Sequence, residues 1–117
     1  MKDNIIRNKT FDFAIRIIKV YKYLKNSKNE FILSKQLLRS GTSIGANIEE
    51  AIGGQSRSDF SSKLSVAYKE ARESGYWIKL LEKSEYLSTK EAQSLLEDLT
   101  EILKIIGKIQ KTLKANS

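Results

Sequence analysis

Hydrophobic residues recur every three or four positions in four stretches of this chain, and short polar segments separate the stretches. That spacing places side chains on one face of an α-helix. The connections are roughly four residues long, which favours antiparallel neighbours in a bundle. We therefore predict one all-α domain over residues 1–117, an antiparallel up-down-up-down four-helix bundle. Its helices are expected at about 5–28, 31–52, 57–83 and 88–114.

Serine followed three residues later by an acidic residue is a signal for a helix N-terminus. Three such pairs precede the last three predicted helices: Ser27 and Glu30, Ser56 and Asp59, and Ser88 and Glu91. Gly53 and Gly54 follow the second helix, and we expect them to end it, since glycine tolerates the left-handed conformation of many helix caps. Gly41 lies on the core stripe of that helix at a cost of ~1 kcal/mol relative to alanine. We expect a closely packed neighbouring helix to compensate for this cost.

The first predicted helix has two apolar stripes, although a helix that packs on one core needs only one. Phe11, Ile15 and Ile18 belong to one stripe, and Phe13 and Ile17 to the other. The fourth helix is also widened on one side. Either these helices sit deep inside a monomer, or they contact another subunit; a domain of this size favours the second. We expect these residues at a subunit interface: Phe13, Ile17, Val20, Leu24, Ile102, Ile105 and Ile109.

A row of polar residues runs beside the core stripe of the second helix at spacings of three and four. Such a row either binds a ligand or forms a hydrogen-bonded network that fixes how helices meet. We favour the network. Its expected members are Arg39, Ser43, Asn47, Glu50 and Glu73.

The chain has no cysteine and no histidine. It therefore lacks disulfides, a thiolate nucleophile, the usual neutral-pH general base and the Glu-x-x-His pairs of di-iron bundles. Glu50, Glu70 and Glu73 are carboxylates that an enzyme hypothesis would use, but no histidine accompanies them. We predict no enzymatic activity, no cofactor and no metal. No apolar run approaches the roughly 18 residues of a membrane span, and no signal-peptide core begins the chain. These absences predict a cytoplasmic protein without a membrane partner.

The net charge is +7, and the first 28 residues hold eight lysines and arginines against two aspartates. In the last helix the acidic residues precede the lysines, which either complements the helix dipole or forms a footprint for a polyanion. The predicted topology brings the start of the first helix, the 53–57 turn and the end of the last helix together. Lys2 would lie at this end. The residues expected to contact nucleic acid are Arg7, Lys9, Arg57, Lys104, Lys108, Lys111 and Lys114.

Three segments carry a resemblance to a bacterial family. The run LLRSGTSIGANIEE (37–50) resembles the pattern R-x-x-x-S-I-x-x-N-I-x-E-G, and SRSDF (56–60) resembles S-R-x-[DE]-F. Residues 64–81 are similar to the third helix of this family. Its members are four-helix bundle proteins encoded within intervening sequences of 23S rRNA genes, often labelled ribosomal-protein-like, and related to accessory proteins of diversity-generating retroelement reverse transcriptases. Ala51 departs from the pattern, which usually has glycine there.

The resemblance implies a homopentamer with no known enzymatic activity. For the retroelement relatives it implies binding to nucleic acid and to reverse transcriptase. We therefore expect a non-enzymatic homo-oligomer, a pentamer, that binds RNA or DNA, RNA in particular, through phosphate contacts with little base reading. The alternative is a protein-interaction scaffold that docks a partner enzyme such as a reverse transcriptase.

Overall fold

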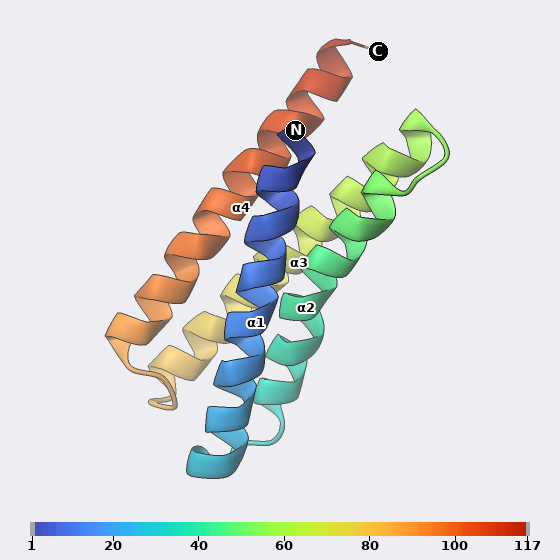
Figure 1. The fold of residues 1–117 in the computed structure, drawn as a ribbon. Coiled ribbons are helices and arrows are strands. Elements are labelled where there is room, and N and C mark those ends of the chain that lie inside the picture. The colour runs from blue at the N-terminus through green and yellow to red at the C-terminus, as the bar shows by residue number, and fades with distance from the viewer. Residues whose placement is uncertain (1, 117) are drawn as a thin grey trace.

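A computed structural model describes residues 2–116, and the side chains of residues 5–116, as four α-helices (Figure 1). The helices are α1 (Lys2–Lys28), α2 (Leu33–Ile52), α3 (Arg57–Lys83) and α4 (Thr89–Ala115). Consecutive helices run in opposite directions in a bundle of 47 × 21 × 21 Å. The predicted antiparallel four-helix bundle is confirmed. The second helix begins at Leu33 and not at 31.

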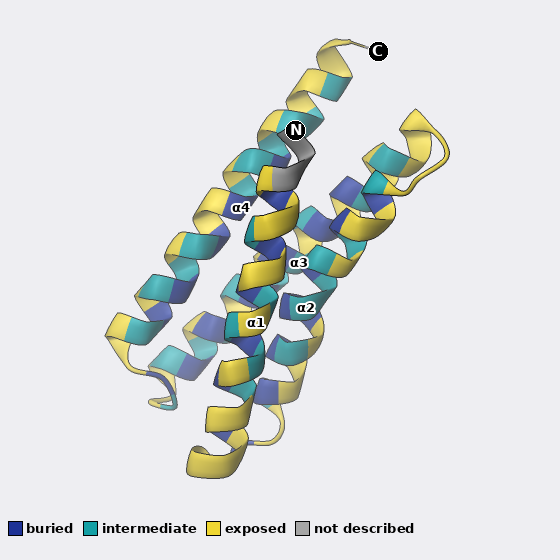
Figure 2. Ribbon diagram, viewed as in Figure 1, coloured by how far each residue is buried: buried dark blue, intermediate teal, exposed yellow. Residues whose placement is uncertain are grey.

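Each helix packs against its two neighbours around the bundle, and the backbones of the helices on the diagonals do not approach each other. The most extensive contact joins α2 and α3, and the smallest joins α1 and α4. Aliphatic side chains from all four helices meet in one core, and Figure 2 shows the buried residues on the inward faces. Burial of this apolar surface is the main force that holds the bundle together.

The two apolar stripes of α1 have the opposite roles from those predicted. The stripe expected at a subunit interface lies in the core, and Ile102 of α4 is buried with it. Ile105 and Ile109 are half-buried and pack against the same core. Phe11, on the other stripe, is 65% exposed. The buried residues of the misassigned set are Phe13, Ile17, Val20, Leu24 and Ile102.

Contacts with both neighbours show how α1 is rotated. Arg7 Nε lies 2.8 Å from Glu49 Oε1 of α2, and Lys9 Nζ lies 3.4 Å from Glu101 Oε1 of α4. These two residues flank the stripe that contains Phe13, so this stripe faces the core. The periodicity of one helix shows the angle between its two apolar stripes. It does not show on which side the neighbouring helices lie, so it could not show which stripe is buried.

Two of the three serine signals cap helices as predicted. Ser56 Oγ accepts a hydrogen bond from the Asp59 amide at 3.0 Å, and Ser88 Oγ accepts one from the Glu91 amide at 3.1 Å. The glycine prediction is wrong in its geometry, because Gly53 ends α2 with φ −83° and no glycine has a positive φ among the described residues. A Cβ on Gly54 would lie 3.1 Å from the Ala51 carbonyl oxygen, so close packing is what favours glycine there.

Glu30 caps α2, and Ser27 does not, because α1 continues through Lys28. The Glu30 carboxylate accepts hydrogen bonds from the amides of Ile32, Leu33 and Ser34 at 3.2, 3.0 and 2.7 Å. Burial alone raises the pKa of this carboxyl, but these bonds and the Ser34 hydroxyl together lower the pKa below its ordinary value. The ionised side chain therefore stabilises the first turn of α2.

We expect Glu30→Ala to lower the free energy of unfolding by about 1–2 kcal/mol at neutral pH, since three amides lose their acceptor. A lowered folded-state pKa means that the carboxylate stabilises the fold above its unfolded pKa. This contribution is lost as the pH falls through the folded pKa. The difference between variant and parent should therefore shrink in acid. Urea denaturation at several pH values measures it, with the exposed Glu97→Ala as the control. A difference that does not change with pH would contradict this role.

Gly41 allows α1 to approach α2 closely, as predicted. A Cβ at this position would lie 2.8 Å from Ile17 Cγ1 and 2.9 Å from Cγ2, and Ile17 is itself fully buried. At Gly107 of α4 the nearest atom to an added Cβ is Tyr68 Cε2 at 4.0 Å, an ordinary contact. The two helical glycines thus differ in available space and not in helix propensity.

We expect Gly41→Ala to lower the free energy of unfolding by about 1–3 kcal/mol, because overpacking outweighs the gain in propensity. Gly107→Ala should raise it by up to about 1 kcal/mol, since the space is open. Thermal and urea denaturation of both variants measure the contrast. Equal stabilisation by the two substitutions would show that the close approach at Gly41 is not tight.

Candidate functional site

The start of α1, the α2–α3 turn and the end of α4 lie at one end of the bundle (Figure 1). Arg57, the first residue of α3, connects α3 to α4 at this end, because its Nη2 donates a 2.8 Å hydrogen bond to the Leu113 carbonyl oxygen. Lys114 lies one residue further on. The side chain of Lys2 lies outside the described residues.

Two of the predicted nucleic-acid contacts, Arg7 and Lys9, are engaged within the chain. Arg7 pairs with Glu49, and Lys9 pairs with Glu101. Their positive charge is partly neutralised by these carboxylates, so each attracts an anion less than a lone cation would. Sequence reasoning placed Glu49 at this end as a partial counterweight, but it could not identify the pairs themselves, because both acidic partners are distant in the chain.

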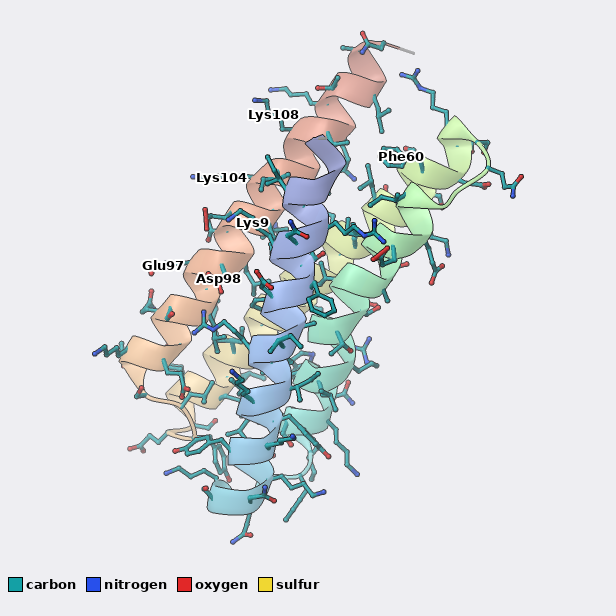
Figure 3. The ribbon with its side chains drawn as sticks, viewed as in Figure 1. Lys9, Phe60, Glu97, Asp98, Lys104 and Lys108 are labelled. Atoms are coloured by element: carbon teal, nitrogen blue, oxygen red, sulfur yellow. The ribbon has the colours of Figure 1, made fainter. Side chains whose placement is uncertain are left out.

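Lys104, Lys108 and Lys111 form an exposed row, which we call the lysine row, on the C-terminal half of α4. Spacings of four and three residues place them on one side of the helix. Figure 3 shows Lys104 and Lys108 projecting away from the bundle. No ion pair between described side chains involves any of the three. The row is therefore an uncompensated positive feature of α4 among the described side chains, and the exposed lysines between residues 19 and 28 of α1 form a second one.

Acidic side chains occupy the N-terminal half of α4, as predicted. Asp98 Oδ2 accepts a 2.7 Å bond from Arg16 Nη1, and Ser94 Oγ lies 3.0 Å from Arg16 Nη2. Glu97 is exposed (Figure 3). Asp98 and Glu101 in the acidic half of α4 thus form ion pairs with α1. The lysines of the basic half follow these residues in the chain.

A groove with a volume of about 670 Å³ runs between α3 and α4 beside the lysine row. Gln110 Nε2 donates to Ser65 Oγ across it at 3.5 Å, the limit of a hydrogen bond. No acidic residue lines it among the described side chains. Sequence reasoning missed the serines, although their spacing of three and four residues along α3 was visible. We call it the serine groove, and its lining residues are Arg57, Ser58, Ser61, Ser62, Ser65, Gln110, Leu113 and Lys114.

The polar row divides into separate contacts. Arg39 bonds Glu73, and its Nη1 lies 3.2 Å from Glu70 Oε1, so it links α2 to α3. Trp77 Nε1 donates to Glu73 Oε2 at 2.9 Å. Because half of the Arg39 side chain is exposed, this cluster contributes only about 0–1 kcal/mol to stability. Glu70 belongs to it, which the sequence reasoning did not include.

The other members of the row do not reach this cluster. Asn47 Nδ2 donates to the Ser43 carbonyl oxygen at 2.8 Å and so stays within α2. Glu50 pairs with Lys63 Nζ at 2.7 Å. Every one of these polar groups is therefore engaged with its own chain, and the row offers no open site for a ligand.

Apolar side chains remain exposed along the seam of α1 and α2. Two shallow grooves of about 220 and 760 Å³ follow this seam, and Thr42 lines both. Ile15 is exposed beside them. We call this surface the α1–α2 face, and its apolar residues are Phe11, Ala14, Ile15, Ile18, Leu38 and Ala46.

The described residues provide neither a metal site nor a membrane span. No group of three or more carboxylates is placed to hold a metal ion. None of the described helices is long and apolar enough to cross a membrane.

The family model for the 23S rRNA-intervening sequence protein matches residues 2–108. The chain is also similar to a crystal structure of a protein with unknown function from the S23 ribosomal protein family of Bacteroides thetaiotaomicron VPI-5482. The two are 51% identical with a TM-score of 0.93, and the match covers 95% of this chain and 99% of that one. Comparison with curated proteins finds no match. Lys104 and Lys108 lie inside the family match, and Lys111 lies beyond it.

Proposed function

This chain belongs to the 23S rRNA-intervening sequence protein family, and we propose that it is a non-enzymatic, homo-oligomeric protein that binds nucleic acid, RNA in particular, through a basic surface. The lysine row is the observation that carries this proposal. Three exposed lysines without an acidic partner among the described side chains attract a polyanion and release its counterions on contact. RNA is the first anion to test, since the family takes its name from an rRNA.

The proposed contacts are a subset of those expected from the sequence. Lys104, Lys108 and Lys111 provide the uncompensated charge, and Arg57 and Lys114 lie beside them in the serine groove. Arg7 and Lys9 contribute less, because each already pairs with a glutamate. The proposal includes no cofactor and places the protein in the cytoplasm, where ribosomal RNA functions.

The proposed oligomer is a pentamer, the state that the family resemblance implies. Its interface needs exposed apolar surface, and the α1–α2 face supplies this in place of the buried stripe of α1. A ring of copies with the same orientation would repeat the basic end of the bundle around one rim. Charge on such a rim adds up and strengthens the attraction for a polyanion.

A protein-interaction scaffold is the second candidate. The exposed Phe11 and Ile15 favour it, since an apolar surface of this kind also suits a partner enzyme such as a reverse transcriptase. A scaffold would keep its partner after nuclease treatment and after neutralisation of the lysine row. Loss of the partner under either treatment would instead support nucleic acid as the bridge.

We expect the variant with Lys104→Gln, Lys108→Gln and Lys111→Gln to bind 23S rRNA fragments more weakly than the parent. Each lost phosphate contact should reduce the slope of log affinity against log salt by about 0.7–0.9. Fluorescence anisotropy over a salt series measures both quantities. Lys90→Gln is the control, because it is exposed at the opposite end of the same helix. No binding by the parent at low salt would refute the proposal.

We expect Phe11→Asp to shift the assembly to smaller species. A buried phenylalanine contributes about 2 kcal/mol or more, and an unpaired carboxylate in the same place is costly. The monomer should stay folded, since Phe11 is exposed within it. Sedimentation velocity gives the mass and circular dichroism the helix content, with the exposed Phe31→Asp as the control. A monomeric parent protein would contradict the proposed oligomer.

A further inference from the structure

The serine groove continues the lysine row across α4. Lys111 and Lys114 lie three residues apart, so their side chains are neighbours on the surface of the helix. Gln110 and Lys114 line the groove, whereas Lys111 belongs to the row. Charged and neutral polar side chains thus form one surface over the end of α4 and the start of α3.

Serine hydroxyls and a guanidinium are the polar groups of this groove that suit an anionic backbone. A hydroxyl both donates and accepts hydrogen bonds, so it can bind phosphate oxygens and ribose hydroxyls. No side-chain hydrogen bond involves Ser58, Ser61 or Ser62 among the described residues. The bond to the Leu113 carbonyl oxygen holds one nitrogen of Arg57 at the edge of the groove. The remaining nitrogens of this guanidinium have no other hydrogen bond within the described residues.

No exposed aromatic side chain lies on this surface among the described residues, and Tyr68 of α3, which packs near Gly107, is half-buried. The sequence of α4 contains no phenylalanine, tyrosine or tryptophan, and none lines the groove. Proteins that bind single strands usually stack the exposed bases on aromatic rings. The exposed aromatic residues belong to other parts of the molecule: Phe11 and Tyr23 on α1, Phe31 in the α1–α2 connection, and Tyr76 on α3.

We propose that the serine groove and the lysine row together bind the sugar–phosphate backbone of a double helix. The bases of a duplex are already stacked on one another, so the backbone and its hydroxyls are what such a molecule presents. The lysine row contacts phosphates by charge, and the groove serines add neutral hydrogen bonds. The inference rests on the proposed function and specifies the form of nucleic acid and a second set of contacts.

Neutral and charged contacts leave different signatures in a salt series. The variant with Ser58→Ala, Ser61→Ala and Ser62→Ala should bind a duplex about five- to thirtyfold more weakly, since it lacks three hydroxyls. Its salt slope should equal that of the parent, because a hydroxyl displaces no counterion. Alanine is a better helix former than serine, so the fold should be kept. Ser27→Ala, exposed at the opposite end of the bundle, is the control.

The experiment compares an RNA duplex, a DNA duplex and an unstructured single strand of equal length. Both duplexes should bind more tightly than the single strand, and a larger serine effect on RNA would identify contacts to the 2′-hydroxyl. A single strand that binds as tightly as the duplexes would overturn the inference. So would an unchanged duplex affinity of the serine variant. Absence of binding to all three molecules would refute the proposed function as well.

Discussion

Close packing around α2 is the constraint on which the rest of this bundle depends. Gly41 gives Ile17 of α1 the space that a Cβ would occupy. One residue earlier, Ser40 faces α3, where it accepts a buried 2.9 Å hydrogen bond from Ser74. Neither contact allows much sliding, since one is steric and the other satisfies buried polar groups. α2 therefore sets the positions of α1 and α3, and α3 in turn carries the wall of the serine groove.

Local features of the fold could be predicted from the sequence, because they arise from residues close together in the chain. Helical periodicity located the four helices, and Ser56 and Ser88 marked two N-termini. Contacts between distant residues could not be predicted in this way. The neighbours of α1 decide which of its stripes is buried, and Glu70 and Lys63 of α3 decide how the polar row of α2 divides.

The candidate nucleic-acid interface also combines features that the sequence shows with features that depend on contacts between distant residues. All seven expected cations were visible in the sequence, yet only tertiary contacts show that Arg7 and Lys9 are paired. Lys104 and Lys108 have no ion pair with any described side chain. The serine groove depends on two helices lying side by side. A one-dimensional pattern shows which residues can share a face, and the charge that remains on that face depends on what packs beside it.

The order of charges along α4 has a consequence for assembly. In a ring whose copies point the same way, the lysine rows of neighbouring copies repel one another, and this repulsion opposes the closure of the ring. A polyanion lying along the rim removes that repulsion. Thermodynamic reciprocity then requires that assembly strengthens the binding of the polyanion by the same factor by which the polyanion strengthens assembly. In the proposed oligomer, the charge separation within one helix would thus make bound RNA a ligand that favours the larger assembly.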